Sequence, residues 1–349
     1  MSPEGNGGPG GRTARLSEDQ ESRRELIASI ASMYYLDNLD QNAIGKQVGL
    51  SRSTVSRMIT EARQSGIVSI RIVRALPRDR ALEDRARAEY GLRDALVVAA
   101  PSPGVAAAPL ARVGMLAARH LEQRLPKDGT LAISWGTSVS AVADGLTDDP
   151  SRQVRTVQML GAAGSRQPAI DGPELARTFA ARLGGEYRTL NAPLVLDDEA
   201  LVLALLRQHS VSSVLAAAAQ ADVAVIGLGC MAPEGSSLLR AGFAQRADLA
   251  DSVAGGAVGD AGGHMLAADG SVVQTALSRR MLRLDEQSLR DIPEVVAVAV
   301  GPAKVAIIRA ALRSGIVDVI ATDAPTMEAV LSHGTAGSLA SHDGKQGKK

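Results

Sequence analysis

The stretch from residue 41 to residue 72 constrains the fold more than any other part of the chain. Ile44 and Val48 lie four residues apart, which places both on one face of a helix. Gly49 follows them, and glycine readily adopts the positive φ angle that a tight turn requires. Helical spacing of apolar residues then resumes at Val55. The pattern therefore predicts two helices joined by a turn, the arrangement known as a helix-turn-helix.

The second helix of this pair carries side chains that are suited to DNA. Ser51 occupies the position of an N-cap, so we expect the helix to begin at Arg52. Arginine can bind a guanine edge or a phosphate, and serine and threonine hydroxyls can donate to bases or to the backbone. The candidate DNA-binding residues are Gln41, Ser51, Arg52, Ser53, Thr54, Ser56 and Arg57.

Local charge separates this stretch from an ordinary helical hairpin, in which the same arginines and serines would only face solvent. Residues 51 to 74 hold five arginines and one glutamate, a local charge of +4 in a chain of net charge zero. Such asymmetry is typical of a surface that binds nucleic acid. Aromatic residues make up only 2% of the chain, which argues against RNA and single strands because those are bound by stacking. Double-stranded DNA is therefore the expected partner.

Length and composition predict the domain organisation. At 349 residues the chain exceeds what one core usually organises, so two domains are expected. Alternating apolar residues from Ile67 to Ile72 predict a short strand or wing. The predicted segments are a disordered tail at 1–22, a winged helix-turn-helix domain at 23–76 whose first helix spans 23–35, a linker helix within 77–92, an α/β domain at 93–334, and a second disordered tail at 335–349.

The α/β prediction rests on short runs of Val, Ile, Leu and Ala that alternate with amphipathic segments. Near-continuous apolar runs are typical of strands that are buried on both faces of a parallel sheet. The predicted strands lie at 95–99, 130–134, 154–160, 223–229, 295–300 and 317–321, with examples of the covering helices at 110–124 and 303–313.

Glycine-rich turns after these strands are candidate anion sites. Gly136, Thr137 and Ser138 follow a predicted strand and open a helix, where free N–H groups and the helix dipole favour an anion. The alternative is an ordinary strand-to-helix turn with a capping hydroxyl. The turn at 161–166 brings a guanidinium to the same end of the sheet. Lys304 opens a later helix and could meet a phosphate or an aldehyde. The alternative is a surface lysine, but the helix dipole disfavours a cation in the first turn, which slightly favours a functional role.

Several classes of protein are disfavoured. The longest apolar runs are too short to span a bilayer, and the N-terminus lacks the apolar core of a signal peptide, so we expect a cytoplasmic protein without a membrane partner. Cys230 is the only cysteine, which predicts a buried apolar role, and the five histidines show no metal-ligand spacing with it. We therefore expect no metal and no cofactor. The usual motifs of P-loop NTPases and serine hydrolases are missing from the sequence.

Taken in order, these motifs resemble the SorC family of sugar-binding transcriptional regulators, which is also grouped with the deoxyribonucleoside-regulator type. The resemblance covers nearly the whole chain. It is carried by the pattern of residues 41–68, by Ser-Trp-Gly-Thr-Ser at 134–138, Val-Gln-Met-Leu-Gly at 157–161, Asp-Val-Ala-Val-Ile-Gly-Leu-Gly at 222–229, Gly-Ala-Val-Gly-Asp at 256–260, the segment 301–312, and Ile-Ala-Thr-Asp at 320–323.

The resemblance implies an effector domain similar to sugar-phosphate isomerases and deaminases, a phosphorylated sugar or polyol as ligand, and a homo-oligomer, dimer or tetramer, on palindromic operators. It also implies a ligand site, whose residues would be Gly136, Thr137, Ser138, Gly161, Arg166, Asp260, Lys304 and Asp323. The chain departs from the family pattern at Ala162 and Pro302, where glycine is more common. Leu160 precedes Gly161, so covalent capture of an aldehyde by a Schiff base is not expected there.

We therefore predict a ligand-responsive, DNA-binding regulator of carbohydrate metabolism with no enzymatic activity. One alternative is a sugar-phosphate isomerase or deaminase with an appended DNA-binding segment, although no convincing acid/base pair is visible and a fold alone does not give activity. A second alternative is a constitutive DNA-binding protein with a vestigial pocket.

Overall fold

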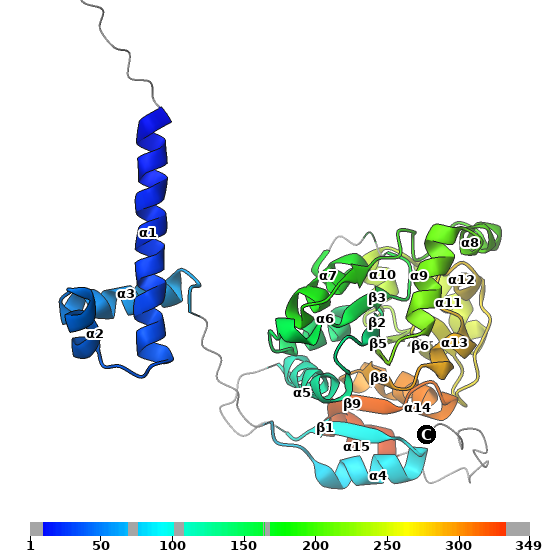
Figure 1. Cartoon of the computed structure of the whole chain (residues 1–349). Helices are drawn as coiled ribbons and strands as arrows, with labels where there is room; N and C mark the ends of the chain where they lie inside the picture. The colour runs from blue at the N-terminus through cyan, green and yellow to red at the C-terminus, as the bar shows by residue number, and fades with distance from the viewer. Residues whose placement is uncertain (1–9, 69–75, 101–107, 163, 165–167, 333–349) are drawn as a thin grey trace, which may run out of the picture. The chain divides into compact units, whose positions relative to one another are not determined.

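The computed structural model describes residues 10–68, 76–100, 108–162, 164 and 168–332, with side chains described from residue 21 onward. The chain divides into two compact units, Met1–Ala75 and Leu76–Lys349 (Figure 1). The predicted segments 1–9 and 335–349 and most of the predicted wing, residues 69–72, lie outside the described residues.

The first unit contains the helices α1 (Gly10–Tyr35), α2 (Gln41–Val48) and α3 (Arg52–Gln64). Asp40 caps α2 by accepting hydrogen bonds from two backbone N–H groups, and Gly49 ends it with a φ of 70°. Ser51 caps α3 by accepting from the Thr54 N–H at 3.2 Å. Both helices thus begin at residues that favour an N-cap, and α2 ends at a glycine that favours the left-handed conformation. The predicted turn and its two flanking helices are therefore present.

A small core holds the three helices of this unit together. Its buried residues include Ile30 from α1, Ile44 from α2, and Val55 and Ile59 from α3. The prediction was wrong about where α1 begins, because residues 10–22, expected to be disordered, extend the helix N-terminally. The physical reason is that this stretch contains no proline after Pro9 and many good helix formers, which let the helix continue beyond the segment that the core requires.

The predicted linker helix exists as α4 (Arg80–Tyr90), but it belongs to the second unit. Leu82 and Ala86 are buried in the main core. The Glu83 carboxylate is buried as well, and it accepts from Arg78 at 2.6 Å and from the Val97 N–H at 2.9 Å. Because its apolar edge and its buried acid both have partners in the sheet domain, α4 is a fixed part of that domain.

The second unit is built on a parallel sheet whose order is β1-β9-β8-β5-β2-β3-β4. Two further strands, β6 and β7, extend β5 as an antiparallel ribbon. The strands are β1 (Asp94–Val98), β2 (Thr130–Ile133), β3 (Arg155–Gln158), β4 (Tyr187–Arg188), β5 (Val223–Cys230), β6 (Gly259–Ala261), β7 (His264–Leu266), β8 (Val295–Val298) and β9 (Val319–Asp323). All six predicted strands are present with slightly different ends, whereas β4, β6 and β7 were not predicted.

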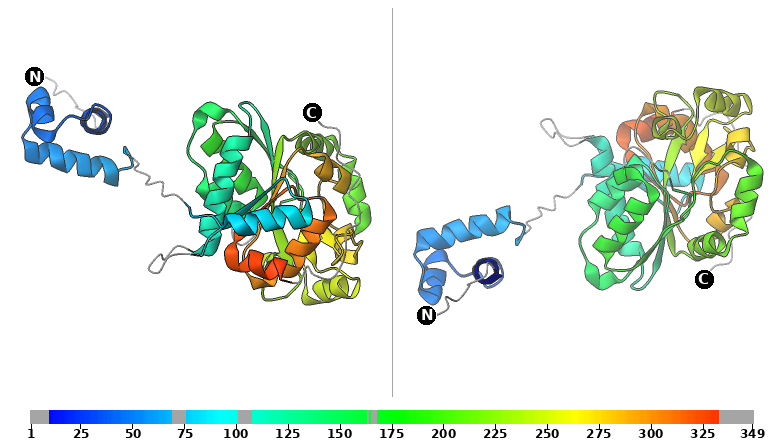
Figure 2. Two further views of the ribbon diagram at one scale, coloured as in Figure 1. Left: turned by 90° about the horizontal axis from the view of Figure 1, so that it is seen from below. Right: turned by 90° about the horizontal axis from the view of Figure 1, so that it is seen from above.

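Helices lie on both faces of the sheet (Figure 2). Besides α4, the helices of this unit are α5 (Pro109–Arg124), α6 (Thr137–Gly145), α7 (Gly172–Leu183), α8 (Glu199–Leu206), α9 (His209–Ala219), α10 (Ser237–Ala241), α11 (Arg246–Ala254), α12 (Ala276–Arg279), α13 (Glu286–Asp291), α14 (Val305–Ser314) and α15 (Ala324–Leu331), with 3-10 turns η1 (Pro150–Arg152), η2 (Pro168–Ile170) and η3 (Pro302–Lys304).

Alternation along the strands divides the core between these two faces. In β1, Ala95 and Val97 belong to one buried cluster, while Leu96 and Val98 belong to the other. This is the two-residue period of a strand buried on both sides. Cys230 is buried, as predicted. In the part of the chain that the structure describes, no single helix is long and apolar enough to cross a membrane, and only the bent pair formed by α8 and α9 passes that test together.

Candidate functional site

The loop between β2 and α6 forms the first wall of the candidate site. Gly136 has φ 110° and ψ 174°, a backbone region that is essentially restricted to glycine. Its N–H donates to the Ile170 carbonyl at 2.9 Å. Gly136 is the N-cap of α6 and has no side chain, so no side-chain cap satisfies the N–H groups of the first turn, beside Thr137 and Ser138.

The loop between β8 and α14 repeats this backbone geometry. Gly301 has φ 105° and ψ 160°, and no atom lies within 4 Å of the position that a Cβ would occupy. Its N–H donates to the Thr326 hydroxyl at 2.8 Å. Lys304 ends the short η3 turn, and its Nζ donates to the Leu228 carbonyl at 2.7 Å. The sheet thus presents two glycine loops of the same kind at the ends of parallel strands, where α/β domains commonly bind ligands.

A partly buried acid, Asp260, provides a third wall. The Asp260 carboxylate accepts from the Gly263 N–H at 3.3 Å. A Cβ on Gly229 would lie 1.9 Å from Asp260 Oδ1, so only glycine at position 229 leaves room for this side chain. Burial raises the pKa of Asp260 above its usual value, while the positive charges of Lys304 and Arg283 act in the opposite direction.

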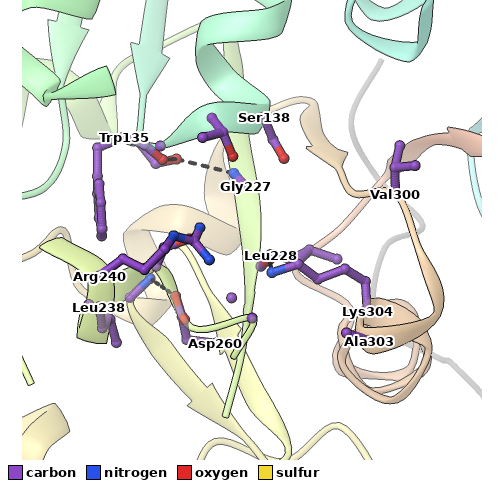
Figure 3. Close-up of a pocket in the computed structure, with 18 of the residues that line it drawn as sticks. Trp135, Ser138, Gly227, Leu228, Leu238, Arg240, Asp260, Val300, Ala303 and Lys304 are labelled. Carbon is purple, nitrogen blue, oxygen red and sulfur yellow. Dashed lines mark hydrogen bonds between the residues drawn. The ribbon is translucent and has the colours of Figure 1, made fainter. Parts of the chain in front are cut away.

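These walls enclose a cavity of about 360 Å³ (Figure 3). Five of the eight predicted ligand-binding residues line it, namely Gly136, Thr137, Ser138, Asp260 and Lys304. Two others do not line it. A Cβ on Gly161 would lie 2.3 Å from the Pro193 carbonyl oxygen, so this glycine permits close packing. Asp323 is the last residue of β9, where it pairs with Val98 of β1, and it is not among the lining residues. Arg166 lies outside the described residues.

The short helix α10 contributes a further wall, which the sequence did not predict. Ser237, Leu238 and Arg240 line the cavity from this short helix. They carry no recognisable motif, and only the folded chain brings them to the glycine loops. Trp135, which belongs to the Ser-Trp-Gly-Thr-Ser motif and was not predicted to bind the ligand, also lines the cavity and packs edge-to-face on Phe243, with ring centroids 5.4 Å apart.

The first unit exposes most of the predicted DNA-binding residues on α3 and its cap. Arg52, Ser53, Ser56 and Arg57 are exposed, whereas Val55 on the same helix is buried. Ser51 is exposed too, but its hydroxyl is engaged with Thr54 as an N-cap and lies 2.9 Å from the Ser53 hydroxyl. Gln41 and Thr54 are partly buried. The helix therefore separates a packed face from a polar face that carries two arginines.

Comparison with known proteins identifies this combination of domains. A family model described as "Putative sugar-binding domain" matches residues 74–332. The transcriptional regulator LsrR of Klebsiella pneumoniae subsp. pneumoniae is 31% identical over 315 residues, which cover 89% of this chain and 94% of that protein. LsrR of Escherichia coli K12 is 30% identical over 320 residues, covering 90% and 97%.

Solved structures agree with these matches. The full-length sorbitol operon regulator SorC from Klebsiella pneumoniae superimposes with a TM-score of 0.66 at 25% identity, covering 88% of this chain and 99% of that one. A sugar-binding domain of a transcriptional repressor from Vibrio fischeri gives a TM-score of 0.65 at 28% identity, covering 73% and 99%. The fold and the site thus define a transcriptional regulator with a C-terminal sugar-binding domain. The chain belongs to the SorC family of such regulators, as its motifs predicted. These relatives are regulators, and the enzyme alternative gains no support from them.

Proposed function

We propose that this protein binds double-stranded operator DNA through its first unit, and that a phosphorylated sugar or polyol bound in the cavity controls this binding. The observation that carries the proposal is the meeting of two glycine loops, after β2 and β8, at one cavity. Backbone N–H groups at helix N-termini favour anions. The cavity thus combines a place for a phosphate with polar groups for hydroxyls.

Within the cavity we assign the phosphate to Gly136, Thr137 and Ser138, which open α6. Asp260 would accept a hydrogen bond from a sugar hydroxyl, and Lys304 would donate one from the facing wall. Arg166 remains a candidate from the resemblance alone. The local support for the assignment is that both loops have open space where a Cβ would stand, which lets a ligand approach the backbone closely.

DNA binding is assigned to the exposed face of α3, with Arg52, Ser53, Ser56 and Arg57 as the contacting residues. We further propose a homo-oligomer, a dimer or a tetramer, acting in the cytoplasm. A two-fold dimer must place its recognition helices about 34 Å apart, or at a multiple of that distance, to reach successive major grooves. Ligand binding that changes subunit packing would alter this spacing and therefore the affinity for the operator.

A thermal-shift screen of sugars, each tested with and without a phosphate, examines the proposed ligand. A ligand at 100 times its dissociation constant stabilises the folded state by about 2.7 kcal/mol, which corresponds to roughly 5 to 10 °C for a domain of this size. We expect such shifts for some phosphorylated compounds. If no compound in the screen stabilises the protein although it binds its operator, a constitutive DNA-binding protein is favoured. Turnover of a phosphosugar would instead favour the enzyme.

A further inference from the structure

The helix α8 exposes an apolar surface that its own unit does not cover. Seven of its eight residues are alanine, valine or leucine, yet only Val202 is buried. The side chains of Leu201 and Leu203 are 44% and 50% exposed. Figure 1 shows α8 at the outer margin of the second unit. A single exposed leucine is normal on a protein surface, whereas an exposed apolar patch on one helix indicates an interaction surface.

The exposed face of α8 is suited to packing against another helix. Successive residues of an α-helix are rotated by about 100°, so Ala200 and Ala204 lie on the side opposite the buried Val202. Leu201 and Leu203 lie on either side of this pair of alanines. Small residues let the backbones of two helices approach closely, and the flanking leucines can then interdigitate with those of the partner.

Charges at the two ends of α8 indicate which partner fits this face. Three acids are exposed at its N-terminal end, namely Asp197, Asp198 and Glu199. Arg207 is exposed at its C-terminal end. Among the residues that the structure describes, no ion pair is found for Asp197 or Arg207. A second copy of α8 that packs antiparallel across a two-fold axis places the acidic end of each helix beside Arg207 of the other. The surface is therefore complementary to itself.

A membrane is the other surface that could cover exposed leucines. By length and composition, α8 and α9 together resemble a broken membrane span. However, α9 buries Val211 and Leu215 in the core of the second unit, so these residues do not face lipid. The three acids beside α8 would also be repelled by an anionic membrane surface. Another protein surface is therefore the better partner.

The segment that precedes α8 connects it to the ligand cavity. The Leu194 N–H donates to the Ala162 carbonyl at 2.9 Å, and the Leu194 carbonyl accepts from the Leu282 N–H at 2.8 Å. Leu160, which lines the cavity, pairs with Arg283 in the same strip of backbone. A ligand that displaces Leu160 would therefore act on α8 through these backbone hydrogen bonds.

We propose that α8 is the centre of a two-fold contact between two copies of this chain, in which the exposed leucines of each copy pack against those of the other. This inference rests on the proposed function, because it names the surface through which the proposed homo-oligomer forms. The eight residues of α8 span about 12 Å, whereas a stable interface buries about 800 Å² on each partner. The contact therefore includes neighbouring surface, such as α12, whose Arg279 lies 3.7 Å from Glu199.

The test measures self-association of the full chain by sedimentation equilibrium. Leu203→Glu places an unpaired charge in the contact and should raise the dissociation constant of the oligomer about tenfold or more. Because Leu203 is half exposed in a single copy, circular dichroism should show an unchanged fold. Val253→Glu is the matched control, since Val253 is 53% exposed on α11 and lies outside α8. It should leave the dissociation constant unchanged.

A charge exchange tests the antiparallel arrangement. Arg207→Glu brings like charges together in the contact and should weaken association several-fold. Asp197→Arg should do the same, because it places two cations at each end. The double variant restores opposite charges at both ends and should recover most of the affinity of the parent. A double variant that associates no better than the single ones would contradict the antiparallel packing of two α8 helices.

The outcomes separate this inference from the proposed function. A parent protein that stays monomeric at every concentration would overturn the proposed homo-oligomer and this contact with it. An oligomeric parent whose Leu203→Glu variant associates equally well would overturn only the role of α8. If the parent binds vesicles of phosphatidylcholine and phosphatidylglycerol, and Leu203→Glu abolishes this binding without changing association, α8 is a membrane surface and the proposed contact is wrong.

Discussion

Replacing Gly136 with alanine tests whether the backbone conformation of the loop at Gly136, Thr137 and Ser138, rather than its packing, is needed for ligand binding. We refer to this segment as the phosphate loop. No atom lies within 4 Å of the position that the new Cβ would occupy, so the methyl group itself meets nothing. The backbone, however, has φ 110° and ψ 174°, and a residue with a Cβ rarely adopts this conformation. The substitution therefore perturbs the backbone of the loop and little else.

The magnitude follows from that strain. A non-glycine residue held in this region costs about 1 to 3 kcal/mol, which lowers the melting temperature of a domain of this size by roughly 2 to 12 °C. If the loop relaxes instead, the peptide plane rotates and the hydrogen bond from Gly136 N–H to the Ile170 carbonyl, 2.9 Å long, is lost. When the loop relaxes, the N–H groups beside Thr137 and Ser138 move, and phosphosugar affinity should fall at least tenfold.

Calorimetric melting and phosphosugar titration of the Gly136→Ala protein provide the assay, with Gly91→Ala as the control. Gly91 ends α4 with φ 67° and likewise has open space at its Cβ position. Its replacement should cost about 1 to 2 kcal/mol without changing ligand affinity, because it lies outside the cavity lining. A Gly136→Ala protein that melts and binds like the parent would refute the claim that this backbone geometry forms the site.

Three further predictions concern α3, the loop of Gly136, Thr137 and Ser138, and the buried His264. Arg57→Ala should weaken operator binding by about 1 to 3 kcal/mol if Arg57 reaches a base, or reduce the salt slope by about one if it reaches phosphate; binding measured at several salt concentrations and found unchanged would reject the assignment. The double replacement Thr137→Ala and Ser138→Ala should abolish the response to phosphosugar while operator binding persists, and unchanged affinity in titration calorimetry would exclude this loop. Burial and the nearby Arg283 charge lower the pKa of His264 from 6.5 to about 3, so the unfolded chain binds a proton that the native protein does not, and its contribution to stability is lost as the pH falls from 6.5 toward 3, by up to about 1.4 kcal/mol per pH unit. Urea unfolding across this range should show a shallower decline in His264→Gln, and equal slopes in the two proteins would show that His264 titrates normally.

Local chemistry explains which elements were predictable. Strands such as β2 and β8 were visible because both of their faces are buried, which leaves almost no polar residue inside them. The turn between α2 and α3 was visible because Gly49 and Ser51 are local signals that need no tertiary partner. By contrast, β4 contains only two residues and is exposed on both, so it carries no apolar signal that a sequence analysis could detect.

The residues of the site that follow a strand were predictable from the local sequence, whereas Asp260, which lies in β6, was predicted from the resemblance alone. Gly136 and Lys304 satisfy that condition, since each lies in the loop after a parallel strand. Arg240 depends on the placement of α10 against the loops, which is a property of the folded chain. Gly161 was predicted to bind the ligand but does not line the cavity. It packs closely against Pro193, 32 residues away by number, so glycine is needed there for packing.

The central claim is that cavity and operator are coupled, and measuring operator affinity of the full chain with and without the stabilising phosphosugar tests it most directly. We expect the ligand to change operator affinity by roughly 5- to 150-fold, which corresponds to about 1 to 3 kcal/mol of coupling. Linkage requires operator DNA to change ligand affinity by the same factor, and a fragment that ends near Pro77, without the second unit, should show no response. Equal operator affinity with and without bound ligand would contradict the account, as would a fragment that binds the full operator as tightly as the intact protein.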